Sequence, residues 1–122
     1  MPVCLSAGAA VAVIATQSFT LAWNHSVEKL RWEEDWRIEA GHLTLAEARI
    51  RGTGAGMEAP AGARLLAGVW HYRPHLPPQS VLRLTHSPHA AGYEICRSGC
   101  ATLAALLPGL ASEAVIEISP CR

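Results

Sequence analysis

Charge is scarce in this sequence. Only 16% of the 122 residues are charged, and ten Lys and Arg balance ten Asp and Glu. A neutral chain has no long-range attraction for nucleic acid or for an anionic membrane surface, so we expect neither as a partner. Because 50% of the residues are hydrophobic, the chain has enough apolar surface to offset the entropy lost on folding, which excludes disorder. This length predicts one domain, residues 1–122, with one core.

Charged residues are completely absent from the first 27 positions. A secretory signal peptide normally carries Lys or Arg before its apolar region, and the first basic residue here is Lys29. A transmembrane helix needs about 20 mainly apolar residues, whereas Ser, Gly, Thr and Gln interrupt this run. Phe19, Leu21 and Trp23 instead fall on one side of an extended chain. We therefore assign this segment to the folded domain and expect no transmembrane segment.

Familiar catalytic and cofactor motifs are also missing. Ser26 is not in a G-x-S-x-G elbow, and the sequence has no H-E-x-x-H zinc motif. The Gly-rich stretch RGTGAGMEAPAGA at 51–63 lacks the last glycine of G-x-G-x-x-G and the Lys of a P-loop. We expect no catalytic residue, no metal and no cofactor, which predicts a protein that is not an enzyme.

Two interpretations of the Gly-rich stretch stay open. Successive backbone N–H groups around Gly54 and Gly56 would cradle an anion. Alternatively, the glycines permit the positive φ angles of a long ordered loop, with Met57 packed into the core.

Short segments that end in turn residues dominate the rest of the chain. Turn signals recur about every 8–12 residues, which is typical of an all-β, antiparallel β-sandwich or partly open barrel. We predict at most one short helical turn, within 102–110, before Pro108 ends it. The predicted strands are 3–7, 10–15, 18–25, 32–39, 42–50, 64–66, 69–73, 80–86, 92–97, 100–103 and 114–119.

EAGH at 39–42 predicts a hairpin turn with Ala40 and Gly41 at its tip. The following segment, LTLAEARI, has residues that also suit a helix, but the turn before it favours a strand. Simple alternation along that strand predicts Leu45 and Glu47 on the same face.

The four cysteines, Cys4, Cys96, Cys100 and Cys121, allow three pairings. Cys96 and Cys100 flank a short turn and would face each other in a hairpin, and Cys4 and Cys121 lie near termini that often meet. Free thiols in a reducing compartment are the alternative. The spacing is not that of a zinc ribbon or zinc finger.

The polar stretch WNHSVEKLRWEEDWRIE at 23–39 is the main candidate for function. If a hairpin loop spans 26–31, His25 would lie near Glu28 or Glu33 and form an acid–base pair. The plainer interpretation is a solvated hairpin end with ordinary ion pairs. Trp32 and Trp36 share one strand face, which is either core or an exposed aromatic platform.

The stretches HSVE at 25–28, WEEDW at 32–36 and GTGAGME at 52–58 together resemble the bacterial family called domain of unknown function eighteen-fifty. Members of that family are often encoded beside tripartite ATP-independent periplasmic transporters of the TAXI type. The resemblance implies a periplasmic or membrane-associated location, although this chain does not show the basic residues and anchor of some relatives. It supplies no catalytic residues.

Two functional hypotheses follow. The first is a non-enzymatic accessory or binding domain of such a transport system, which contacts a transporter subunit or a small solute. Its surface would include His25, Ser26, Glu28, Trp32, Glu33, Gly54, Gly56 and Met57. The second is a small hydrolase or isomerase in which His25 acts as the base and Glu28 or Glu33 orients it.

Overall fold

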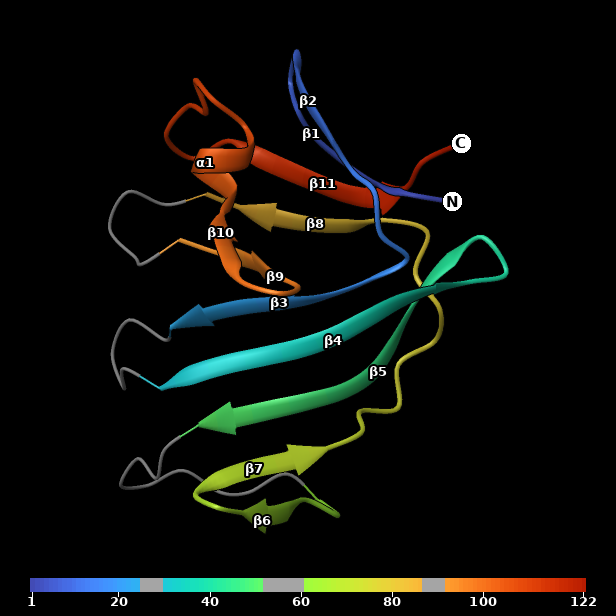
Figure 1. Cartoon of the computed structure of the whole chain (residues 1–122), viewed down its shortest axis with the longest axis vertical. Helices are drawn as coiled ribbons and strands as arrows, with labels where there is room; N and C mark the ends of the chain where they lie inside the picture. The colour runs from blue at the N-terminus through green and yellow to red at the C-terminus, as the bar shows by residue number, and fades with distance from the viewer. Residues whose placement is uncertain (25–29, 52–60, 87–91) are drawn as a thin grey trace.

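A computed structural model describes residues 1–24, 30–51, 61–86 and 92–122. Within these ranges the chain forms two antiparallel sheets and one short helix (Figure 1). The predicted all-β, sandwich-like fold is confirmed, and the strand ends differ from the predicted ones by at most two residues among the described positions.

The small sheet brings the two ends of the chain together. Its strand order is β2-β1-β11-β8, and β1 pairs antiparallel with β11. The N and C termini accordingly lie near each other in Figure 1. The strands are β1 (Val3–Ala7), β2 (Ala10–Ile14), β8 (Leu82–Thr85) and β11 (Val115–Pro120).

The large sheet has the strand order β10-β9-β3-β4-β5-β7-β6. Its longest strands, β4 and β5, lie side by side below β3 in Figure 1. The strands are β3 (Ser18–Asn24), β4 (Arg31–Glu39), β5 (His42–Arg51), β6 (Arg64–Leu66), β7 (Val69–Tyr72), β9 (Glu94–Cys96) and β10 (Cys100–Thr102).

The turn between β4 and β5 is the predicted one. Glu39 pairs with His42, and Ala40 and Gly41 have φ angles of 51° and 77°. Positive φ at both central residues is the type I′ geometry, whose twist matches that of the flanking strands. The turn therefore fixes the register of the two strands on which the polar residues lie.

The predicted alternation along β5 is wrong, because a β-bulge interrupts it. Asp35 pairs with Glu47 but Trp36 pairs with Leu45, so Ala46 is the extra residue. The extra residue shifts the alternation of inward and outward side chains by one position, so Leu45 and Ala48, three residues apart, are both buried. Glu47 therefore lies on the opposite face from Leu45.

One core lies between the two sheets. The small sheet contributes Leu5 and Ile118, and the large sheet contributes Leu21, Trp36 and Leu43, all almost fully buried. Alternation of apolar residues along each strand produces this one-sided burial. Both sheets are needed to cover the core.

The predicted helical turn is α1 (Leu103–Leu106). Thr102 Oγ1 accepts a hydrogen bond from the backbone N–H of Ala105 at 3.1 Å, which caps its first turn. Leu103 and Leu107 insert into the core. Among the described residues, no helix has the length and apolar character that a membrane span requires.

Candidate functional site

Polar side chains gather on the face of the large sheet that points away from the core. They occupy every second position of β4 from Arg31 to Asp35 and of β5 from Glu47 to Arg51, and the bulge places the β5 set in phase with the β4 set. Neighbouring elements add a histidine and a glutamate. We call this set the ionic network: Arg31, Glu33, Asp35, Glu47, Arg49, Arg51, His71 and Glu94.

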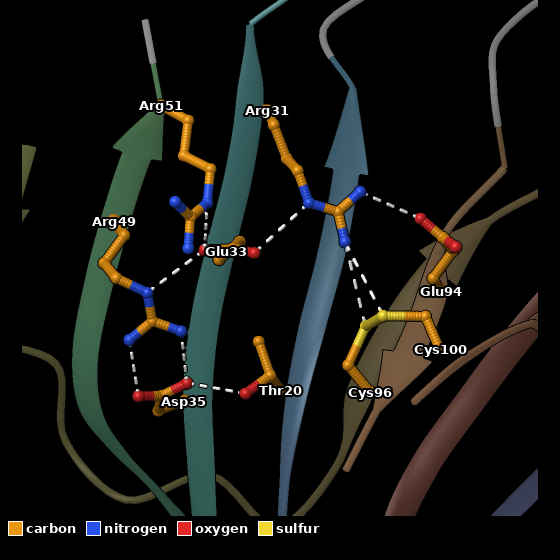
Figure 2. The surroundings of a disulfide bond; sticks show 9 residues. All are labelled: Thr20, Arg31, Glu33, Asp35, Arg49, Arg51, Glu94, Cys96 and Cys100. Carbon is orange, nitrogen blue, oxygen red and sulfur yellow. Dashed lines mark hydrogen bonds and ion pairs between the residues drawn. A yellow bond between two sulfur atoms is a disulfide. The ribbon is translucent and has the colours of Figure 1, made fainter. Parts of the chain in front are cut away.

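Arg49 donates to three carboxylates of the ionic network, those of Glu33, Asp35 and Glu47, and Figure 2 shows the first two of these contacts. Its Nη1 and Nη2 donate to the two carboxylate oxygens of Asp35 at 2.6 and 2.7 Å, and its Nε donates to Glu33 Oε1 at 3.1 Å. Thr20 Oγ1 donates to Asp35 at 2.7 Å. The hydrogen bonds from Arg49, opposed by partial burial and assisted by Thr20, lower the pKa of Asp35.

Glu33 receives hydrogen bonds from three arginines. Arg31, Arg49 and Arg51 donate to it at 3.2, 3.1 and 3.0 Å, and the residue is only 8% exposed. Burial raises the pKa of Glu33, but the hydrogen bonds from Arg49 and Arg31 outweigh it, and the net shift is downward. Glu33 therefore stays ionised as a part of the ionic network.

Arg31 connects the ionic network to a disulfide. Its Nη1 donates to Glu94 at 2.9 Å, and its Nη2 lies 3.8 Å from the sulfurs of both Cys96 and Cys100. The hydrogen bond to Glu94 is the main reason that the pKa of Arg31 is raised. Figure 2 shows this guanidinium between Glu33 on one side and the disulfide on the other.

Both predicted disulfides are present. Cys96 and Cys100 are paired across the β9–β10 hairpin, and Cys4–Cys121 joins β1 to the residue after β11. Of the three possible pairings, the structure has the one in which Cys96 and Cys100 face each other on paired strands, and Cys4 and Cys121 join the two ends of the chain.

Two hollows flank Asp35 and Ala46 on this part of the surface. The first has a volume of about 450 Å³, and within it His71 Nδ1 lies 2.7 Å from Glu47 Oε1. Its other lining residues are Gly62, Arg64, Tyr72 and Arg73. The second hollow, about 460 Å³, is bordered by Thr20, Arg37, Cys96 and Arg97 among others.

Trp32 lies on the inner face, opposite Glu33. It is half-buried and stacks on Trp23, with ring centroids 6.2 Å apart and planes at 14°. Within the described part of the chain, no group accepts a hydrogen bond from its buried Nε1. Trp36 is 3% exposed and belongs to the core. The structure thus separates Trp32 from Glu33, although the sequence analysis assigned both to one surface.

Glu34 is an inward-facing carboxylate beside these aromatic residues. Trp36 Nε1 donates to its Oε1 at 3.2 Å. Burial raises the pKa of Glu34 despite this hydrogen bond, and burial followed by the charge of Glu34 raises the pKa values of Tyr72 and Tyr93.

Six of the predicted site residues lie outside the described ranges: His25, Ser26, Glu28, Gly54, Gly56 and Met57. The strand ends next to residues 25–29 and 52–60 are adjacent, because Asn24 pairs with Arg31 and Arg31 pairs with Arg51. In residues 1–24, 30–51, 61–86 and 92–122 there is no cluster of three or more His, Cys, Asp or Glu that would hold a metal.

Sequence reasoning missed Arg49 and His71, which the structure places in the ionic network. The signal for Arg49 is the alternating charge of EARIR at 47–51, which matches that of RWEED at 31–35 across a hairpin. The signal is obscured because the bulge at Ala46 breaks the alternation from Leu43. His71 gives no local signal, since its partner Glu47 is on another strand.

Comparison with known families identifies the chain. The sequence model of the domain of unknown function (DUF1850) matches residues 19–103. The chain belongs to this family. The matched part of the DUF1850 domain includes β4, β5 and the Cys96–Cys100 hairpin, whereas β1, β2 and β11 lie outside it. No curated protein and no solved structure matches the chain significantly.

Proposed function

We propose that this DUF1850 domain is a non-enzymatic binding or accessory domain of a TAXI-type tripartite ATP-independent transport system, and that it acts outside the cytoplasm. The ionic network and the hollows beside Asp35 form its recognition surface. The occupant is a subunit of the transporter or a small solute of that system. The observation that carries the proposal is the ionic network itself, a pattern of paired charges on one face of the large sheet.

The contacts in the ionic network suit binding better than proton transfer. Glu33 and Asp35 each accept hydrogen bonds from arginines, and both have lowered pKa values. Such carboxylates are poor proton acceptors near neutral pH. Fixed charges of both signs instead select a partner with the complementary pattern and exclude others.

Two disulfides support the location. Disulfides persist mainly in oxidising compartments such as the bacterial periplasm. The chain has four cysteines, and all of them are paired. The association with a transport system rests on the family resemblance of the HSVE, WEEDW and GTGAGME stretches.

A capture experiment tests the proposal. Arg64 and Arg73 line the first hollow and are exposed, so Arg64→Glu with Arg73→Glu replaces both of its arginines with acidic residues without disturbing the core. Arg83→Glu, on the small sheet, is the matched control. We expect the wild type and the control to capture a transporter subunit from detergent-solubilised membranes, and the double variant to capture at least about tenfold less.

The proposal fails if no transporter subunit is captured and a deletion strain takes up the transported solutes at the wild-type rate. Equal capture by the double variant would show that the first hollow is not part of the binding surface. The uptake assay with the same variants then distinguishes a structural role from binding.

A hydrolase or isomerase is the second candidate, and one contact favours it. His71 Nδ1 is 2.7 Å from Glu47 Oε1 in an open hollow, which is the arrangement of a base and the residue that orients it. The version with His25 and Glu28 concerns residues outside the described ranges. Turnover of a small-molecule substrate that His71→Asn abolishes, while Arg83→Glu retains it, would favour this candidate over binding.

A further inference from the structure

The two disulfides differ in their surroundings. Cys4–Cys121 closes a separation of 117 residues next to the paired strands β1 and β11. Cys96–Cys100 closes a separation of 4 residues at the tip of a hairpin, where Cys100 is exposed and Cys96 borders the second hollow. A reductant can therefore approach the second bridge without opening the core.

A cation is already in place beside this exposed bridge. Arg31 Nη2 is 3.8 Å from both sulfurs. Its Nε and Nη1 are held by Glu33 and Glu94, and its side chain is 27% exposed. A guanidinium held at this position would stabilise a thiolate formed on either sulfur, because a nearby positive charge lowers the pKa of a cysteine.

From these contacts we propose that Cys96–Cys100 is a thiol–disulfide exchange site, and that Arg31 positions and stabilises the thiolate released when a dithiol reductant attacks. The inference goes beyond the proposed binding function and does not depend on it. Cys4–Cys121 has no such role and remains a structural bridge.

A thiolate of the reductant attacks the exposed Cys100 Sγ, the S–S bond breaks, and Cys96 leaves as a thiolate beside Arg31. The second thiolate of the reductant then attacks the reductant's first sulfur, which is bonded to Cys100 Sγ in the mixed disulfide. The bond between these two sulfurs breaks, and Cys100 is released as a thiolate. The protein gains two electrons and takes up protons from solvent as its thiols require, and the reductant becomes a disulfide.

The test is differential reduction of the folded full-length protein. The protein is incubated with dithiothreitol without denaturant, alkylated at intervals and digested for mass spectrometry. We expect Cys96 and Cys100 to be alkylated while Cys4 and Cys121 stay paired. In the reduced hairpin, one thiol should have a pKa about one unit or more below the ordinary value of about 8.5.

Arg31→Gln is the informative variant, and Arg51→Gln is its control because Arg51 also binds Glu33 but makes no hydrogen bond to sulfur among the described residues. We expect Arg31→Gln to return the thiol pKa toward about 8.5 and to slow reduction by about threefold or more. Arg51→Gln should change neither value. Arg31→Lys, which keeps the charge, should retain much of the lowered pKa.

Each opposite result overturns the proposal. One is reduction of Cys96–Cys100 only together with Cys4–Cys121 and with loss of the circular dichroism of the fold. Another is a thiol pKa that is the same in the wild type and in Arg31→Gln. If Arg31→Gln does not fold, the comparison of the wild type with Arg31→Lys and Arg51→Gln still decides the question, because an ordinary thiol pKa in all three contradicts it.

Discussion

The small sheet and the large sheet are stabilised differently. Along the strands of the small sheet the charged residues are Arg83 and Glu117, which form one exposed ion pair, and a disulfide joins its first strand to the end of the chain. The large sheet carries the ionic network on its outer face. The two sheets share one core, but their outer surfaces differ, so the loss of an ion pair should cost more on the large sheet than on the small one.

The largest expected difference concerns the two disulfides. In the loop-closure model, removing Cys4–Cys121 with Cys4→Ser and Cys121→Ser should lower the free energy of unfolding by about 5 kcal/mol. Cys96→Ser with Cys100→Ser should lower it by only about 2 kcal/mol, because that loop is short. Urea denaturation measures both. Equal losses would show that the closure of the termini is not what stabilises the small sheet.

Core truncations should affect both sheets alike. Leu5 on β1 and Leu21 on β3 are 0% and 2% exposed. Leu5→Ala and Leu21→Ala should each lower the free energy of unfolding by about 3 kcal/mol, because each leaves a cavity in the shared core. Val11→Ala, at a position that is 66% exposed, is the control and should cost less than about 0.5 kcal/mol. A much smaller loss for Leu21→Ala would contradict a shared core.

The ion pairs of the two sheets should differ in strength. Arg49→Met leaves Glu33 and Asp35 without their central donor, and should lower the free energy of unfolding by about 2 kcal/mol. Arg83→Met breaks an exposed pair on the small sheet and should cost less than about 0.5 kcal/mol. Thermal and urea unfolding of the two variants make the comparison. If the two losses are similar, the ionic network is no more than a set of surface ion pairs.

The smallest expected effects are changes in the pH dependence of the free energy of unfolding. They should differ between the outer face of β4, with Glu33 and Asp35, and its inner face, with Glu34. Asp35 and Glu33 have folded-state pKa values below their ordinary 3.8 and 4.5, so the stability that they contribute is present above those values and is lost as the pH falls through the folded pKa values. Asp35→Asn should therefore destabilise the protein at pH 7 and flatten the decline below about pH 4.

Glu34 should behave in the opposite way. Burial raises its folded-state pKa above 4.5, so its ionisation destabilises the protein as the pH rises from the unfolded to the folded pKa. Glu34→Gln should gain stability relative to the wild type between pH 4 and pH 7. Urea unfolding of both variants from about pH 2 to about pH 7 covers both windows and measures the slopes. Parallel curves for the two variants would contradict the assignment of the residues to opposite faces.

Much of the fold was predictable because its signals are local. The EAGH turn, the alternation around Phe19, Leu21 and Trp23, and the short spacing of Cys96 and Cys100 each depend on neighbours in the chain. Correct prediction of these elements follows from the strand period and from turn geometry.

The candidate site was only partly predictable. Glu33 was recognised, but its role was not, because its partners Arg49 and Arg51 are on another strand and a bulge at Ala46 decides which face they occupy. Trp32 and Glu33 are adjacent in sequence, yet strand geometry directs them to opposite faces of the sheet.

The class of fold, the approximate strands, the β4–β5 turn and the family resemblance can be read from the sequence. The disulfide pairing, the place of Arg49 in the ionic network and the contact of Arg31 with the Cys96–Cys100 bridge depend on how the strands assemble. The two sets of features differ in the sequence separation of the residues that interact. Turns and strand periodicity depend on residues a few positions apart, whereas the contact of Arg31 with Cys100 spans 69 positions and exists only once β4, β3, β9 and β10 are aligned in one sheet.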